Sequence, residues 1–298
     1  MKRWNQCLLM ALCLLAATAG YAQEYEFRLV ATGLAKPTGI AVNGQTIYFT
    51  EVPSPGVAGM GNTVKKLNLL DRMIETLHEG EPEPVNIVVA NDGTIYWVCK
   101  SAGVILKQTP DGDTSVFLMS LHKPSGIDIS NQGVIYFTEV PTPGVANGMN
   151  GVFASADGSG IQTINMGEPE PVDVAVAPNG DVYWTCRSAG VILVRRAKDG
   201  MISVLRSGLK KPTGIAVDRQ GRHLYFTEVP TPGISGANGG MNRVLKHDLR
   251  TGELTVINSG DPQPTDIAVA PNGNVYWTCT SAGVIVEARL VHGRRDDN

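Results

Sequence analysis

The segment PTGIAV at residues 37–42 decides the fold, because close copies of it recur along the chain. It returns as PSGIDI at 124–129 and as PTGIAV at 212–217, and PVNIVV, PVDVAV and PTDIAV, beginning at Pro84, Pro171 and Pro264, interleave with these three. The six copies define six units of about 45 residues, which is the period of a four-stranded β-propeller blade.

Each unit continues with the signals of a β-hairpin. A turn containing glycine follows the segment, and a second apolar run headed by an aromatic pair follows the turn. Glycine supplies the positive φ that a tight hairpin needs, and the aromatic pairs are expected to pack neighbouring blades together. The turns end in Gly44, Gly93, Gly133, Gly180, Gly221 and Gly273, and the pairs begin at Tyr48, Tyr96, Tyr136, Tyr183, Tyr225 and Tyr276.

The ring is predicted to be closed by the N-terminal strand. Only five fourth strands can be placed between the repeats, and the missing one is found at residues 27–37 (FRLVATGLAKP), which resemble residues 202–212 (ISVLRSGLKKP). Pairing of this strand in the last blade would remove the exposed sheet edges of an open array. The sequence therefore predicts an all-β, six-bladed propeller. A helical fold is disfavoured because Gly or Pro interrupts nearly every stretch.

The first 22 residues have the pattern of a cleavable signal peptide. Lys2 and Arg3 precede an apolar run at 7–17, and small residues surround the expected cleavage after Ala22. We expect export, with residues 23–298 forming a single propeller domain that is secreted or extracellular, or periplasmic in a Gram-negative bacterium. No later stretch reaches the roughly 20 apolar residues of a membrane span. The formal net charge of -3 over 298 residues argues against a nucleic-acid partner.

Odd and even blades differ at the end of their second strand. Odd blades end it in Glu51, Glu139 or Glu228, followed by Pro-Gly loops up to residues 62, 150 and 242; even blades end it in Cys99, Cys186 or Cys279. Three cysteines cannot complete a disulfide framework, and alternate blades are too far apart for direct bridges. Buried, inert thiols are therefore favoured over a soft-metal or redox site.

One face is expected to gather charged groups at the mouth of the channel. Lys36, Lys123 and Lys211 precede the odd blades, while Glu83, Glu170 and Gln263 precede the even ones. The lysines and the glutamates Glu51, Glu139 and Glu228 are candidate ligand-binding residues, although a solvated lysine rim is the alternative. Likewise, Trp97, Trp184 and Trp277 either stack on sugars or, as favoured, pack between blades.

The three glutamates have two interpretations. They could form an oxygen-ligand set for Ca²⁺ or Mg²⁺, supplemented by Asp173 and Asp266, because hard cations prefer carboxylate and carbonyl oxygens. Alternatively, and this is the favoured interpretation, each glutamate accepts hydrogen bonds from backbone amides and fixes a loop.

The repeated string of the PTGIAV segment, the hairpin turn and Tyr-Phe-Thr-Glu resembles NHL-repeat propellers, and most of all virginiamycin B lyases. The resemblance implies a six-bladed propeller and, for the lyases, histidine and glutamate around Mg²⁺. No histidine ends a second strand here. Lactonase-type propellers carry Asn or Asp after the inner-strand proline, where this chain has Thr38, Val85, Ser125, Val172, Thr213 and Thr265. Both departures count against carrying over the activities.

The sequence thus favours a non-enzymatic protein that binds an extracellular ligand, glycan or protein through the Pro-Gly loop face. The alternative is a lyase or lactonase at the channel mouth, assisted by Ca²⁺ or Mg²⁺. A third possibility is a purely structural matrix component.

Overall fold

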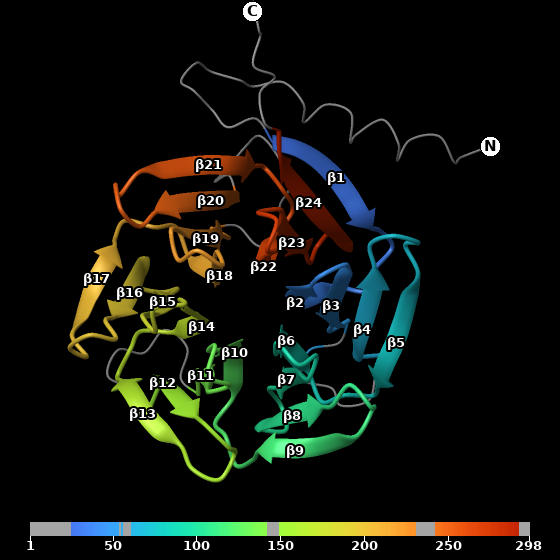
Figure 1. The fold of residues 1–298 in the computed structure, drawn as a ribbon, viewed down its shortest axis with the longest axis horizontal. Coiled ribbons are helices and arrows are strands. Elements are labelled where there is room, and N and C mark those ends of the chain that lie inside the picture. Colours follow the sequence, from blue (N-terminus) through green and yellow to red (C-terminus); the bar gives the residue numbers. More distant parts are fainter. Residues whose placement is uncertain (1–24, 54, 56–60, 142–148, 231–241, 292–298) are drawn as a thin grey trace, which may run out of the picture.

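The six predicted blades form a closed ring around a central channel (Figure 1). The computed structural model describes residues 25–53, 55, 61–141, 149–230 and 242–291. The predicted leader and most of the three Pro-Gly loops lie outside these residues. Within them, every sheet is four-stranded and antiparallel, which confirms the six-bladed propeller. In the same described ranges no helix is long and apolar enough to cross a membrane.

In each blade the first strand lies nearest the channel and the fourth lies outermost (Figure 1). The first three blades contain β2 (Pro37–Asn43), β3 (Thr46–Glu51), β4 (Thr63–Asn68) and β5 (Ile74–Glu79); β6 (Pro84–Val89), β7 (Ile95–Cys99), β8 (Val104–Gln108) and β9 (Thr114–Leu118); and β10 (Pro124–Ile129), β11 (Ile135–Glu139), β12 (Gly151–Ser155) and β13 (Gln162–Met166). The last three contain β14 (Pro171–Val176), β15 (Val182–Cys186), β16 (Val191–Arg195) and β17 (Ile202–Arg206); β18 (Pro212–Val217), β19 (His223–Glu228), β20 (Arg243–Asp248) and β21 (Leu254–Ser259); and β22 (Pro264–Val269), β23 (Val275–Cys279), β24 (Val284–Leu290) and β1 (Tyr25–Ala31).

The N-terminal strand closes the ring as predicted. β1 pairs antiparallel with β24, with Phe27 opposite Ala288, and so supplies the fourth strand of the last blade. Val30 and Ala31 are 5% and 6% exposed and belong to a core cluster with residues of both the first and the last blade. The first described strand and the last one are thereby joined by hydrogen bonds and by apolar burial.

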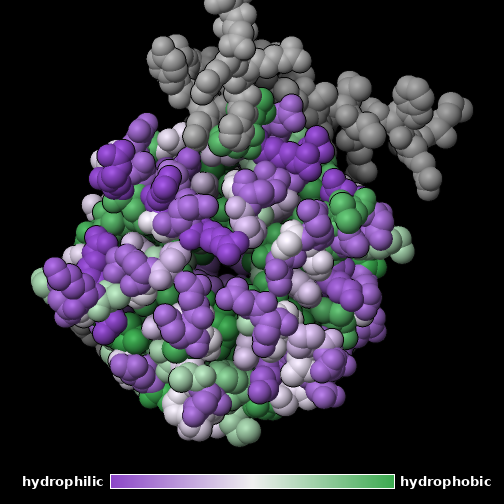
Figure 2. Space-filling model, in the orientation of Figure 1, coloured by the Kyte–Doolittle hydropathy of each residue, from purple (hydrophilic) through white to green (hydrophobic). Residues whose placement is uncertain are grey.

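The aromatic pairs fill the space between blades. One ring of each pair is fully buried in all six blades, and Trp97, Trp184 and Trp277 are each 0% exposed. This burial confirms the packing interpretation and excludes these tryptophans as a surface for stacking sugars. Figure 2 shows that hydrophilic residues instead gather around the central opening on the face in view.

A threonine in the second strand sets the start of the inner strand. The register between first and second strands shifts near this start, and the freed amide donates to a threonine hydroxyl, as from Gly39 to Thr50 at 2.9 Å and from Asp173 to Thr185 at 3.2 Å. The hydroxyl of Thr185 in turn donates to the Thr213 carbonyl of the next blade at 2.7 Å. The threonine hydroxyl therefore holds the start of the inner strand beside the channel. It also links its blade to the next one.

Candidate binding site

A ring of six residues, called the rim below, surrounds the channel where the inner strands begin. All six adopt a left-handed backbone, with φ between 51° and 59°, and each directly precedes a proline. The rim consists of Lys36, Glu83, Lys123, Glu170, Lys211 and Gln263. A residue before proline normally prefers an extended backbone, and left-handed residues other than glycine cost on the order of 1 kcal/mol. Glycine would adopt this backbone at a lower conformational cost. The six rim side chains are therefore present although they make the backbone less stable.

Backbone hydrogen bonds hold the rim in place. The carbonyl of each rim residue accepts from the amide that follows the second strand of its own blade, as from Val52 to Lys36 at 3.1 Å and from Lys100 to Glu83 at 3.0 Å. The same bond is present in all six blades. The rim side chains are thus carried on a rigid backbone.

The rim side chains alternate in chemistry around the ring. Glu83 accepts a hydrogen bond from Ser101 at 2.8 Å, and Ser188 and Ser281 make the same contact with Glu170 and Gln263. The three lysines are exposed. Lys36 donates to the Pro53 carbonyl at 3.0 Å, whereas Lys123 and Lys211 make no side-chain hydrogen bond or ion pair within the described residues. The structure therefore places the three predicted lysines at the mouth, with Lys36 bound to a backbone carbonyl and Lys123 and Lys211 exposed.

The predicted glutamates fix the connection that enters their own blade. Glu51 accepts from the Ala35 amide at 2.8 Å, Glu139 from the His122 amide at 3.0 Å and Glu228 from the Lys210 amide at 2.8 Å. Two of them also have cationic partners: Lys65 lies 2.7 Å from Glu51, and Arg243 donates to Glu228. These contacts support the hydrogen-bonding interpretation of the three glutamates.

The structure does not bring the predicted metal set together. Glu51, Glu139 and Glu228 lie in alternate blades, and Asp173 and Asp266 lie on inner strands of two others. Among the residues that the structure describes, no group of three or more His, Cys, Asp or Glu side chains could hold a metal ion.

The cysteines also bind the connection that enters their own blade, but as hydrogen-bond donors to an acidic side chain rather than as acceptors. The Cys99 and Cys186 thiols donate to Glu81 and Glu168 at 3.3 Å, and the Cys279 thiol donates to Asp261 at 3.9 Å. All three thiols are free and buried, and burial together with the neighbouring carboxylate raises the pKa of each. This environment fits inert thiols. The three acidic partners were missed in the sequence, although each stands 18 residues before its cysteine.

Asn86, Asp173 and Asp266 form a polar layer inside the channel, one on each even blade. Asp266 accepts from the Ile40 amide of the next blade at 2.8 Å, and Asp173 accepts from the Ile215 amide of its next blade at 2.9 Å. Asn86 donates to Asp173 at 3.0 Å. The two aspartates also interact electrostatically with each other. Burial, with the charge of Asp266, raises the pKa of Asp173, and burial raises that of Asp266 to about 7.

A glycine on each odd blade makes room for this layer. A Cβ on Gly39, Gly126 or Gly214 would lie 2.5, 2.5 or 2.6 Å from the Cα of Asn86, Asp173 or Asp266, respectively. The inner strand of each odd blade can approach that of the following even blade this closely only because these three positions carry no side chain.

The aspartate pair predicts a pH dependence of stability. A carboxyl whose pKa is raised on folding stabilises the protein fully below its unfolded pKa, and this contribution is lost as the pH rises through the folded value, here about 7 for Asp266. Asp266→Asn keeps an oxygen for the Ile40 amide but cannot ionise. We expect it to reduce the loss of unfolding free energy between pH 5 and pH 8 by on the order of 2 kcal/mol.

Denaturant unfolding across this pH range measures the effect. The control is Asp157→Asn, because Asp157 is exposed and its side chain accepts hydrogen bonds from its near neighbour Ser159. An Asp266→Asn variant with the wild-type pH dependence would contradict the raised pKa of Asp266.

Comparisons with known proteins agree with this architecture. No family model matches the chain. It is 26% identical over 205 residues to low-density lipoprotein receptor-related protein 1 of Pyricularia oryzae, a match that covers 60% of the chain but only 62% of that relative. It is 25% identical over 247 residues to virginiamycin B lyase of Nocardia farcinica, covering 80% of the chain and 76% of the relative.

Solved structures share the fold at low sequence identity. A streptogramin B lyase superposes with a TM-score of 0.62 at 15% identity, covering 90% of this chain and 98% of that one. A gluconolactonase of Xanthomonas campestris superposes with a TM-score of 0.69 at 16% identity, covering 90% of both chains. The chain is therefore a six-bladed β-propeller. Its structural neighbours include virginiamycin B lyases and gluconolactonases, and its repeat fits the NHL type.

Proposed function

We propose that this protein is an exported, non-enzymatic binding protein that takes an anionic ligand at the rim. The observation that carries the proposal is the set of three exposed lysines, Lys36, Lys123 and Lys211, each in a left-handed conformation that glycine would adopt at lower cost. Strained backbone of this kind clusters at ligand sites, where rigid presentation of a side chain offsets its cost. The three lysines occupy equivalent positions, so the ligand is bound at up to three places.

A pocket lined in part by Lys36 could hold such a ligand. It occupies about 370 Å³ between the last blade and the first two blades. Its lining combines the Lys36 ammonium group and the Glu83 carboxylate with hydroxyl and amide groups from Thr38, Thr280, Ser281 and Gln263. Such pockets typically measure about 300 to 1,000 Å³ and use a few placed polar groups to orient the ligand. A ligand whose carboxylate contacts Lys36 and whose hydroxyls donate to Glu83 matches this lining.

The sequence segments that follow the odd second strands carry no charge. The stretches that follow the odd second strands, residues 54, 56–60, 142–148 and 231–241, contain no Asp, Glu, Lys, Arg or His. These segments therefore supply no carboxylate of their own, and the negative charges of the rim are those of Glu83 and Glu170.

A divalent-metal-assisted lyase or lactonase is the second candidate. The match to virginiamycin B lyase and the fold shared with a gluconolactonase favour it. However, Lys65 lies 2.7 Å from Glu51 and Arg243 donates to Glu228, so a metal would have to displace existing cationic partners. Binding without turnover is therefore the better supported function.

An array of anionic glycans, neutral glycans and extracellular proteins tests the proposal. We expect anionic ligands to bind, and we expect the triple variant Lys36→Gln, Lys123→Gln, Lys211→Gln to lose at least about tenfold in affinity. The matched control removes three other exposed charges through Lys198→Gln, Arg222→Gln and Arg250→Gln. An equal loss in both triple variants, or no anionic ligand on the array, would contradict the proposal. Turnover of a gluconolactone or a streptogramin with Mg²⁺ would favour the second candidate.

A further inference from the structure

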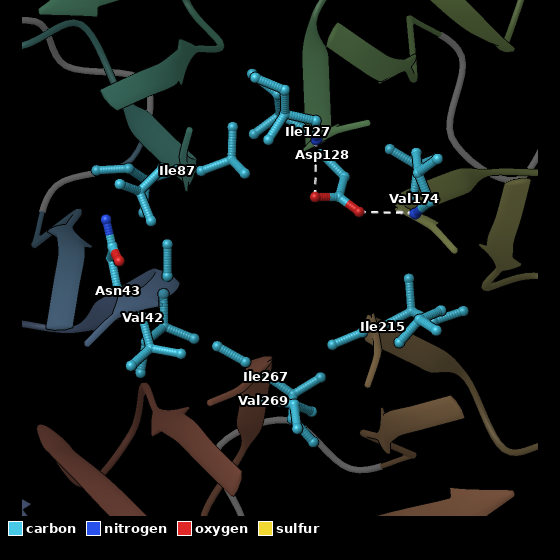
Figure 3. Close-up of a pocket in the computed structure, with 18 of the residues that line it drawn as sticks. Val42, Asn43, Ile87, Ile127, Asp128, Val174, Ile215, Ile267 and Val269 are labelled. Atoms are coloured by element: carbon cyan, nitrogen blue, oxygen red, sulfur yellow. Dashed lines mark hydrogen bonds between the residues drawn. The ribbon is translucent and has the colours of Figure 1, made fainter. Parts of the chain in front are cut away.

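A second cavity occupies the channel on the other side of the polar layer from the rim. It measures about 610 Å³, and its lining runs from Asn86, Asp173 and Asp266 to hairpin-turn residues such as Asn43 and Asn91. It is therefore distinct from the rim site (Figure 3).

The cavity wall is a ring of branched aliphatic side chains. One comes from the same position of every inner strand, and each is partly exposed to the channel: Val42, Val89, Ile129, Val176, Val217 and Val269. Figure 3 shows Val42, Val269 and neighbouring apolar residues directed around the open centre. A wall of this kind gains from contact with an apolar group that displaces water.

Asp128 interrupts this apolar lining. The equivalent positions of the other five blades hold Ala41, Val88, Ala175, Ala216 and Ala268. The Asp128 carboxylate accepts from the Ile129 amide at 2.8 Å and from the Val176 amide of the next blade at 2.7 Å (Figure 3). These two bonds fix the carboxylate at the wall, and the residue stays partly exposed to the channel.

Most of the charged side chains that line the cavity are acidic. Asp128 has no cationic partner within the described residues, and Asp173 and Asp266 lie in the polar layer of the same cavity. Among the described lining residues, Arg219 carries the positive charge, and it lies beside the turn at Gly221, away from the polar layer. Burial raises the pKa of Asp128 to about 6, so the carboxylate is mainly ionised at neutral pH. A carboxylate that faces a cavity without a cationic partner favours a positively charged occupant.

We propose that this cavity binds an organic monocation, a protonated alkylamine, with its ammonium group on Asp128 and its alkyl chain against the aliphatic ring. A divalent metal needs six or more oxygen ligands, and the described residues offer no group of three acidic, histidine or cysteine side chains suited to one. An ammonium group needs fewer partners, and its alkyl chain matches the wall.

Calorimetric titration with butylammonium and hexylammonium chloride at neutral pH tests the inference. Hexylammonium is expected to bind more tightly than butylammonium, and both more tightly than hexanol, which has the chain without the charge. Asp128→Ala is expected to weaken hexylammonium binding by at least about tenfold. Alanine occupies this position in four other blades, so the variant is expected to fold. Asp157→Ala, at an exposed site outside the cavity, is the control.

A rescue variant separates the charge from local structure. Ala216→Asp, added to Asp128→Ala, places a carboxylate at the equivalent position of blade five and is expected to restore hexylammonium binding. Asp128→Asn provides a second test of the charge if Asp128→Ala unfolds. Absence of alkylammonium binding at millimolar concentration, equal affinity for hexanol, or wild-type affinity in Asp128→Ala or Asp128→Asn would overturn the inference. These outcomes are independent of ligand binding at the rim.

Discussion

Gly214→Ala is expected to destabilise the protein by about 3 kcal/mol or more, one of the largest effects of a single methyl group in this chain. The added Cβ would lie 2.6 Å from the Cα of Asp266 and 2.9 Å from the Thr265 carbonyl oxygen. Both atoms belong to the backbone of the neighbouring inner strand, so no side-chain rotation relieves the collision. Moving β22 outward would also weaken the hydrogen bond from the Ile40 amide to Asp266.

Denaturant unfolding of Gly214→Ala beside Gly160→Ala measures this effect. Gly160 has no heavy atom within 4 Å of its added Cβ and does not adopt a positive φ. Its substitution is therefore expected to change the unfolding free energy by less than about 0.5 kcal/mol. Similar stability of the two variants would mean that the inner strands separate without cost.

Removal of β1 is expected to abolish the folded monomer. A chain beginning at Gly33 lacks the strand that pairs with β24 and loses Val30 and Ala31 from the core cluster that contains Phe49 and Ile285. The exposed edge of β24 would then offer unpaired backbone groups to other chains. We expect aggregation on size-exclusion chromatography and no cooperative thermal transition.

A chain beginning at Tyr25 is the matched control for this truncation. It keeps all of β1 and is expected to elute as a folded monomer with a cooperative transition. A monomeric Gly33 chain with the same transition temperature would show that the ring does not depend on closure by β1.

The sequence was sufficient to predict the blades and their closure, because these depend on patterns that repeat. The similarity between residues 27–37 and 202–212 predicted the pairing of β1 in the last blade, which the structure confirms. The hairpin glycines were equally clear, and Gly44 and Gly93 have the expected positive φ.

The sites were harder to predict because they depend on contacts between repeats. The left-handed backbone of Lys36 runs against the usual preference before proline, and only the bond from Val52 reveals why it persists. The partners of Glu51 come from another strand and a preceding connection. The sequence analysis did not single out Asp128, because its significance depends on the cavity that the six inner strands enclose together.

The alternation of glycine and Asn or Asp along the inner ring limits how such a chain can change in length. Loss of an odd blade would set two even blades side by side and bring a side chain into the space that Gly39, Gly126 or Gly214 leaves open, whereas loss of an even blade would set two glycines side by side and leave that space unfilled. Loss or gain of two consecutive blades preserves the alternation. Recombination between repeats in this lineage should therefore be tolerated in steps of two blades, and shorter or longer homologues should have an even number of them.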